Sequence, residues 1–390
     1  MILRTHLSFS KPWLVSSLLF LLASNLFSEK AFRLKFQDWV EDDYRIRVRS
    51  WYAEAGTSLN NDWEVGIVGI VDTISGSTPY GAPPTDNRSD WLAELEEERR
   101  AGVISLATVK DDYEFSFEFG LSDEPDYLSR SYALSLSRNF AKDTLSLHTG
   151  LSYLDDEVDS NVPGGPGLGI QARRTPEIFL GIHRILDPQT TLAFNLTYGR
   201  PEGYLSDPYK QIGRTEPVFP GSSEEDFYLY AENRPNERET FVAYLEGIRL
   251  FKELDASAEA SYRFFSDDAD LSGHTFEFQW FQRLGEKFVL RPLLRHYQQN
   301  AADFYLLNLD NTGITPVPQP NSIGSFYSSD YRLSEFKANT YGLKLTYFHR
   351  SNLSFDLSYD RYAVTGTDDQ TDQRVYPDAG VLTFGFQWGF

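Results

Sequence analysis

Apolar and polar residues alternate strictly along many segments of this chain, and this period of two favours β-strands over helices. The pattern is clearest near the carboxyl end. There, Leu382, Phe384, Phe386 and Trp388 alternate with Thr383, Gly385 and Gln387. Successive side chains of a strand point to opposite faces, so this segment predicts a strand with one apolar face.

The same alternation recurs at 113–119, 192–198, 276–280 and 353–359. Each segment belongs to a stretch of about ten residues, which is the length that crosses a bilayer as a tilted strand. The only longer apolar run precedes residue 30. The sequence therefore predicts an all-β transmembrane barrel and excludes a bundle of membrane helices.

The connections between these segments alternate in length. Short turns are expected at 60–62, 110–112, 141–143, 187–189, 252–255, 285–287 and 350–352. Long stretches rich in Pro, Gly and Asp lie between them, at 73–100, 155–172, 200–238, 299–335 and 364–378. Short turns and long loops in alternation are typical of outer-membrane barrels with tight periplasmic turns and large external loops. We count sixteen antiparallel strands; fourteen or eighteen stay open, because 101–110, 174–185 and 239–251 alternate poorly.

The amino-terminal 28 residues have the features of an export signal. Arg4 and Lys11 precede an apolar run from Trp13 to Ala23, and small residues follow. We expect residues 1–28 to be removed and 29–390 to form the barrel in the outer membrane of a Gram-negative bacterium. Phe390 is then the expected signal for the barrel-assembly machinery.

Composition excludes several classes of function. With no cysteine, the chain has no disulfide or thiolate metal site, and its six histidines lack metal-ligand spacing. A net charge of −21 argues against a nucleic-acid partner. No Gly-x-Ser-x-Gly motif is present. We expect no enzymatic activity, no cofactor and no metal site, and outer-membrane lipid and lipopolysaccharide as surroundings.

The negative charge concentrates in the expected external segments. This pattern is consistent with a solvated loop surface. The alternatives are a crown that gathers divalent cations beside lipopolysaccharide and a field that concentrates cationic solutes at the mouth. Within this crown, 89–100 has the composition of a short helix with Ser89 as its amino-terminal cap.

Charged residues also alternate within the expected strands, where we place them on the lumen face. This set comprises Arg33, Lys35, Arg45, Arg47, Arg49, Glu114, Glu118, Arg263, Arg283, Arg291, Arg295, Asp356 and Asp360. Cross-strand pairing that fills the interior is one interpretation. A charged constriction that selects solutes is the other.

Two motifs begin at expected external strand ends. The first contributes Asp72, Ser75, Gly76 and Pro79, and the second Asp123, Glu124, Pro125, Asp126 and Tyr127. We expect Gly76 to adopt an unusual backbone angle and the two motifs to hold neighbouring loops together. A ligand site with Asp72, Asp123, Glu124 and Asp126 as oxygen donors is the alternative.

Together with 41–48, these motifs resemble an uncharacterised bacterial family with a VDxISGxSP segment and an EPDYxS segment; Thr78 departs from the first. The resemblance implies an outer-membrane barrel and leaves its activity open. Similar proteins also occur beside thioredoxin-like and flavin-transfer proteins, which implies envelope redox partners.

The pattern as a whole predicts a porin-like channel for small solutes, with a modest cation preference arising from the acidic loops. The alternative is a non-conducting structural or docking barrel whose lumen is plugged by its loops or by an envelope partner. The sequence leaves the oligomeric state open.

Overall fold

The computed structural model describes residues 31–60, 62–82, 91–317, 320 and 322–390. The expected signal peptide, together with Asp86, Ser89 and Asp90 of the acidic crown, lies outside these residues.

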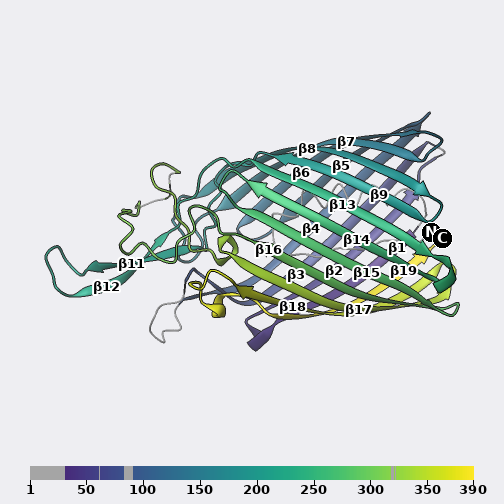
Figure 1. The fold of residues 1–390 in the computed structure, drawn as a ribbon. Coiled ribbons are helices and arrows are strands. Elements are labelled where there is room, and N and C mark those ends of the chain that lie inside the picture. The colour runs from purple at the N-terminus through teal and green to yellow at the C-terminus, as the bar shows by residue number, and fades with distance from the viewer. Residues whose placement is uncertain (1–30, 61, 83–90, 318–319, 321) are drawn as a thin grey trace.

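Sixteen strands close into one antiparallel barrel, as the sequence predicted (Figure 1). Its first half comprises β1 (Ala31–Glu41), β2 (Ile46–Ser58), β3 (Trp63–Pro79), β4 (Leu92–Lys110), β5 (Tyr113–Asp123), β6 (Tyr127–Phe140), β7 (Leu145–Asp159), β8 (Ile170–Asp187) and β9 (Thr190–Gly199). Its second half comprises β13 (Thr240–Phe251), β14 (Ala256–Asp267), β15 (Ser272–Leu284), β16 (Phe288–Gln299), β17 (Phe336–Arg350), β18 (Leu353–Gly366) and β19 (Ala379–Gly389).

Each barrel strand pairs with the next one along the chain, β9 pairs with β13, and β19 pairs back with β1. The closing pair runs in register from Ala31 opposite Gly389 to Glu41 opposite Ala379. Closure leaves no free sheet edge, so the backbone groups are satisfied within the barrel wall.

The apolar face of the alternating segments lies on the outside of the barrel. Phe115, Phe117, Leu180, Phe384 and Trp388 are among its exposed large side chains. A soluble protein would bury such a band, whereas lipid solvates it, so the outer surface suits a bilayer. No described helix is both long and apolar enough to cross a membrane.

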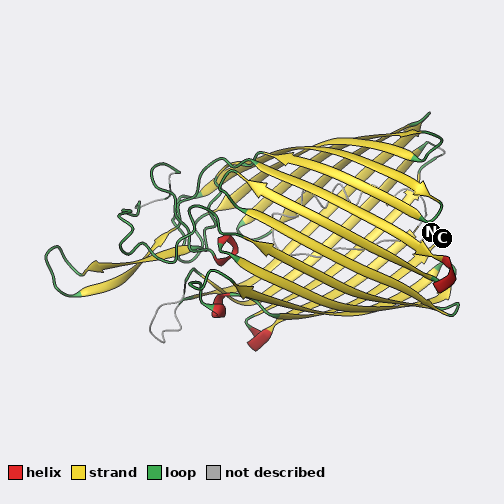
Figure 2. Ribbon diagram, in the orientation of Figure 1, coloured by secondary structure: helices red, strands yellow, loops and turns green. Residues whose placement is uncertain are grey.

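The two ends of the barrel differ, as expected from the connection lengths (Figure 2). The inner end carries the short turns, where β1 begins and β19 finishes. The outer end carries the long loops, which contain β10 (Glu202–Gly203), β11 (Gln211–Pro217), β12 (Glu225–Ala231), and the short helical turns η2 (Asp42–Tyr44), η4 (Tyr331–Leu333) and η5 (Gln373–Val375). A further turn, η3 (Lys252–Leu254), lies at the inner end.

The prediction of a helix at 89–100 is wrong for the residues of this segment that the structure describes. Residues 92–100 continue β4 and pair with the outer half of β3, from Asp72 opposite Arg99 to Pro79 opposite Leu92. The segment LAELEEERR also alternates, and a seventeen-residue partner strand outweighs its intrinsic helix propensity. The barrel wall therefore extends further outward on this side than the sequence suggested.

Candidate functional site

The lumen face of the barrel carries most of the charged residues predicted there. Arg33, Lys35, Arg263, Arg283, Arg291, Arg295, Asp356 and Asp360 line the interior cavity. Glu114 and Glu118 alternate with the exposed Phe115 and Phe117, so they also point inward. The polar face of the alternation is therefore the inner face.

Two arginines of β2 do not lie where the sequence predicted. Ile46 and Val48 line the cavity, so Arg47 and Arg49 point to the outer face. There, Arg47 forms an ion pair with Asp38 at 2.6 Å. Arg45, just before β2, donates from its Nε to Glu41, a residue that lines the cavity, at 2.8 Å. The placement of Arg47 and Arg49 in the lumen was wrong, because β2 rises above the apolar band to a level where the outer face is also polar.

A large cavity, of about 1830 Å³, occupies the lumen. At the inner end it is lined by turn residues such as Lys287 and Asn352. At the outer end its ceiling is formed by loop residues such as Asp207, Arg234 and Arg332. The interior is therefore hollow and charged, and loops lie across one of its ends.

A row of ionic side chains crosses the cavity wall at mid-height. Lys344 pairs with Asp356 at 2.7 Å. Glycine makes room for this carboxylate, because a Cβ at Gly385 would lie 2.3 Å from its Oδ2. A Cβ at Gly342 would likewise lie 2.0 Å from Asp360 Oδ1. These contacts support the cross-strand pairing interpretation of the lumen charges.

The loops that cover the outer end form a cap made of segments far apart in the sequence. We define the cap as the described residues of 200–239 and 300–335. Lys210, on the loop after the ninth strand of the barrel, donates its ammonium to the carbonyl of Pro79 on the third strand. Tyr209 donates to Glu97 Oε1 on β4 at 3.0 Å. The base of the loop between β9 and β13 therefore reaches across the mouth, whereas its β11–β12 hairpin projects away from the barrel (Figure 1).

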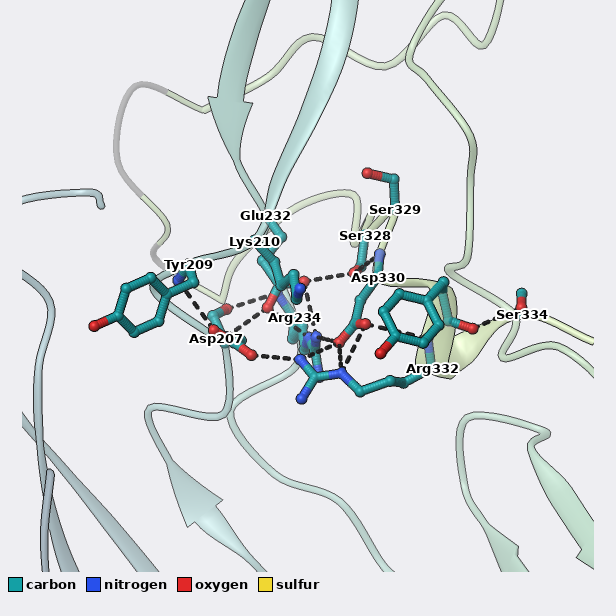
Figure 3. A network of polar contacts seen from close by, with 12 residues as sticks. Asp207, Tyr209, Lys210, Glu232, Arg234, Ser328, Ser329, Asp330, Arg332 and Ser334 are labelled. Carbon is teal, nitrogen blue, oxygen red and sulfur yellow. Dashed lines mark hydrogen bonds and ion pairs between the residues drawn. The ribbon is translucent and has the colours of Figure 1, made fainter. Parts of the chain in front are cut away.

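A buried ionic cluster joins the two cap loops (Figure 3). Arg234 contacts Asp330 at 2.9 Å and Glu232 at 2.7 Å, and the side chains of all three are at most 5% exposed. Arg332 Nε donates to both oxygens of Asp330 at 2.7 Å and its NH2 group pairs with Asp207. Burial opposes ionisation of Asp330, but the charges of Arg332, Lys210 and Arg234 hold its pKa well below the usual range. Removing one partner of such a buried ion pair leaves the other charge buried without a counter-charge, which is strongly destabilising.

Apolar clusters stabilise the same cap. Ile212, Leu309 and Tyr327 are almost fully buried between the two loops. Tyr331 packs with Ala338 of β17 and Val364 of β18, which fastens the cap to the barrel wall. The cap thus has a small core of its own, which the alternation analysis did not detect because its residues lie outside the barrel strands.

The first rim motif is part of the barrel wall. Asp72 lies in β3 and pairs with Arg99 on β4, and Ser75 lies opposite Arg47 on β2. Gly76 has φ of +130°, as expected, and a Cβ there would lie 2.1 Å from the Arg45 carbonyl oxygen. Ser77 N donates to that same carbonyl at 2.7 Å. The motif therefore holds β3 against the turn before β2.

The second rim motif brings together part of the expected ligand set. Glu124 and Asp126 lie with Glu97 so that one oxygen of each is within 4.8 Å of the others. Burial raises the pKa of Glu124 to about 7, and the charges of Asp126, Glu97 and Asp72 add to that shift against the opposing effect of Arg99.

The remaining members of this motif lie elsewhere. Asp123 is exposed at the end of β5, opposite Arg100, and Pro125 is exposed in the turn that follows. Tyr127 instead receives a hydrogen bond from Arg173, whose Nε donates to Asp156 at 2.9 Å. The four carboxylates proposed from the sequence therefore do not form one site. Glu124 and Asp126 lie together, and Glu97 joins them in place of Asp123.

A family model matches this chain over most of its length. The model of a family described as "Protein of unknown function (DUF3570)" matches residues 88–168 and 166–387, which is most of the chain. This protein belongs to the DUF3570 family. No match was found among curated proteins.

Solved outer-membrane barrels resemble this DUF3570 protein in fold. CdiB from Acinetobacter baumannii is 13% identical with a TM-score of 0.50, over 93% of this chain and 60% of CdiB. The ferric enterobactin receptor of Pseudomonas aeruginosa, as a G324V mutant, is 13% identical with a TM-score of 0.43, over 87% of this chain and 54% of the receptor. A bacterial polysaccharide outer membrane secretin is 7% identical with a TM-score of 0.48, over 93% of this chain and 99% of the secretin.

The DUF3570 chain thus spans little more than half the length of the first two of these proteins. Such low identity shows the shared barrel fold alone. The DUF3570 protein is an outer-membrane type β-barrel, and its specific role rests on its own lumen and cap.

Sequence reasoning missed the buried ionic cluster of the cap. Asp207, Glu232, Arg234, Asp330 and Arg332 were counted only as loop charges, although opposite charges two residues apart, in 232–234 and 330–332, were a visible signal. Their convergence depends on contacts between loops about 100 residues apart, such as the one joining Arg234 to Asp330.

Proposed function

We propose that this protein is an outer-membrane passage for small polar solutes whose outer mouth is closed by its own cap. The charged cavity that extends from the short turns to the underside of the cap is the observation that carries this proposal. A barrel of sixteen strands is wide enough for an aqueous channel when side chains do not fill it. The short turns then face the periplasm and the cap faces the exterior.

The cap gives this passage a closed state. It crosses the mouth through the contacts of Lys210 with Pro79 and of Tyr209 with Glu97. Solute entry then requires that the cap move aside, while the barrel wall keeps its register. This requirement separates the proposed passage from a permanently open pore.

Conductance in planar bilayers tests the proposal. The wild-type barrel should show small or rare openings, and Asp330→Asn should increase their size or frequency several-fold, because it weakens the pairing of Arg234 and Arg332. Asp372→Asn is the control, since Asp372 makes an exposed pair with Arg374 away from the buried cluster. A folded Asp330→Asn barrel with a loosened cap that never conducts would contradict a passage function.

The second candidate is a docking barrel for an envelope partner. It is favoured by the turn residues Asp255, Glu286 and Lys287, which line the inner end of the cavity and would offer charges to a periplasmic protein. In that case the purified barrel does not conduct even when the cap is loosened. It binds periplasmic proteins in a pull-down experiment, and a Lys287→Glu variant does not bind them.

We also propose lipopolysaccharide as the neighbour of the outer wall above the apolar band. Arg47 and Arg49 point outward there, as do Glu94, Glu96 and Glu98. Cationic side chains suit lipid phosphates directly, and the carboxylates suit bridging divalent cations. Replacing Arg47 and Arg49 with Gln should reduce co-purifying lipopolysaccharide.

A further inference from the structure

Three arginines gather beneath the cap on the wall formed by β14 to β16. Arg263 of β14 and Arg295 of β16 face the cavity, and Arg238 lines it from the foot of the cap. The charges of all three act on the Tyr297 hydroxyl between them. A Cβ at Gly273 would lie 2.8 Å from that hydroxyl oxygen, so glycine leaves the space that it occupies.

These arginines differ in whether an acidic side chain neutralises their positive charge. Arg238 pairs with Asp267. Arg295 lies beside Glu277 in the adjoining strand. Arg263 lies between Tyr244 and Thr275 in the neighbouring strands, and its guanidinium stands 5.7 Å from the centre of the Phe265 ring. The charged and titratable groups that act on it are Tyr297 and Arg295. No acid pairs with it within the described part of the chain.

An uncompensated guanidinium beside a second one is unfavourable unless water or an anion satisfies it. Its planar array of donors matches the two oxygens of a carboxylate or phosphate group. Thr275 adds a hydroxyl group on the same wall, and the Tyr297 hydroxyl beside it donates to Gln299 Oε1 at 2.6 Å. We propose that Arg263, with Arg295 and Tyr297 beside it, binds the carboxylate or phosphate group of a small anionic solute inside the lumen. This names the solute class of the proposed passage and in that sense rests on it.

The opposite side of the outer lumen has the reverse charge. Glu97, Glu124 and Asp126 belong to β4 and to the turn between β5 and β6, about half the barrel order away from β14 to β16. An anion beneath the cap is repelled by these carboxylates and attracted toward Arg263. The solute is therefore oriented as well as bound.

Binding is measured on the full chain in detergent, independently of conduction. Succinate and inorganic phosphate are the probes, with KCl at matched ionic strength as the reference, and isothermal titration gives the affinity. Losing a hydrogen bond between charged groups costs about 1.5–3 kcal/mol, so Arg263→Gln should weaken binding by at least about tenfold. Arg283→Gln is the matched control, because Arg283 also faces the lumen but lies beside Asp255 near the inner end.

The outcomes separate this inference from the proposed function. Binding of succinate alone assigns a carboxylate solute, and binding of phosphate alone assigns a phosphorylated one. If neither probe binds the folded protein, or if Arg263→Gln binds as the wild type does, the inference is wrong. Should Arg263→Gln fail to fold, Arg295→Gln replaces it, and an unchanged affinity in that variant is equally contradictory. Intact binding in a barrel that never conducts would overturn the passage and leave the site standing.

Discussion

Arg332 and Asp207 form an ion pair across the outer mouth of the barrel, although 125 residues separate them in the chain. Arg332 precedes β17, and Asp207 follows β9. Asp330 completes the connection by holding Arg332 and Arg234 together. The cap is therefore one unit built from two loops, and its integrity depends on a few buried charges.

Arg234→Met should loosen the cap without unfolding the barrel. It leaves Glu232 buried without its cation, while Asp330 keeps Arg332, at a cost of about 3–5 kcal/mol within the cap. Limited proteolysis should then cut within 300–335, while the unheated protein keeps its fast migration on a gel. Arg374→Met, which removes an exposed pair, serves as the control. Equal protease resistance in both variants would show that the apolar clusters alone hold the cap.

Gly76→Ala should destabilise the outer ends of β2 and β3. Its positive φ is unfavourable for a side chain by about 1–3 kcal/mol, and the added Cβ would meet the Arg45 carbonyl. Gly69→Ala, in the same strand, has no atom within 4 Å of the added Cβ and no positive φ. We expect a lower melting temperature for Gly76→Ala only. Matching melting temperatures would contradict the close approach of the two backbones.

The rim cluster should weaken as pH rises from about 4.5 to about 7. The pKa of Glu124 is raised in the folded protein to about 7, so its stabilising contribution is fully present below the unfolded value of about 4.5 and is lost through pH 7. Above that pH, Glu124 is charged beside Glu97 and Asp126. Protease accessibility of the adjoining cap should rise over this window, and Glu124→Gln should remove the rise. A pH profile unchanged by Glu124→Gln would refute this assignment.

Ion selectivity should depend on Glu97 far more than on its acidic neighbours. Glu97 faces the cavity, whereas Glu94, Glu96 and Glu98 point outward from the same strand. In barrels with an open cap, Glu97→Gln should shift the reversal potential toward anions at low salt, where screening is weak. The triple Gln variant of the outward residues should leave it unchanged. A larger effect of the triple variant would contradict this prediction and would support the acidic crown inferred from the sequence as the source of ion selectivity.

Alternation predicted the barrel well because it reports directly on two solvents, lipid outside and water inside. It predicted sixteen strands, with fourteen or eighteen left open, and it predicted the inward direction of Arg263, Arg291 and Asp356. It failed for Arg47 and Arg49, because a strand that extends above the bilayer carries polar residues on both faces. At that level, alternation no longer shows which face points into the lumen. It also failed for the cap, where Asp207 and Arg332 meet through loop paths that local pattern does not encode.

The composition of the cap also has a consequence for the order of assembly. Its two loops are tethered to strands from both halves of the barrel, so its contacts require the segments from β3 to β17 to be in place. The cap can therefore form only after both loops and the strands that hold them have folded, so the outer mouth is sealed after the wall has been built.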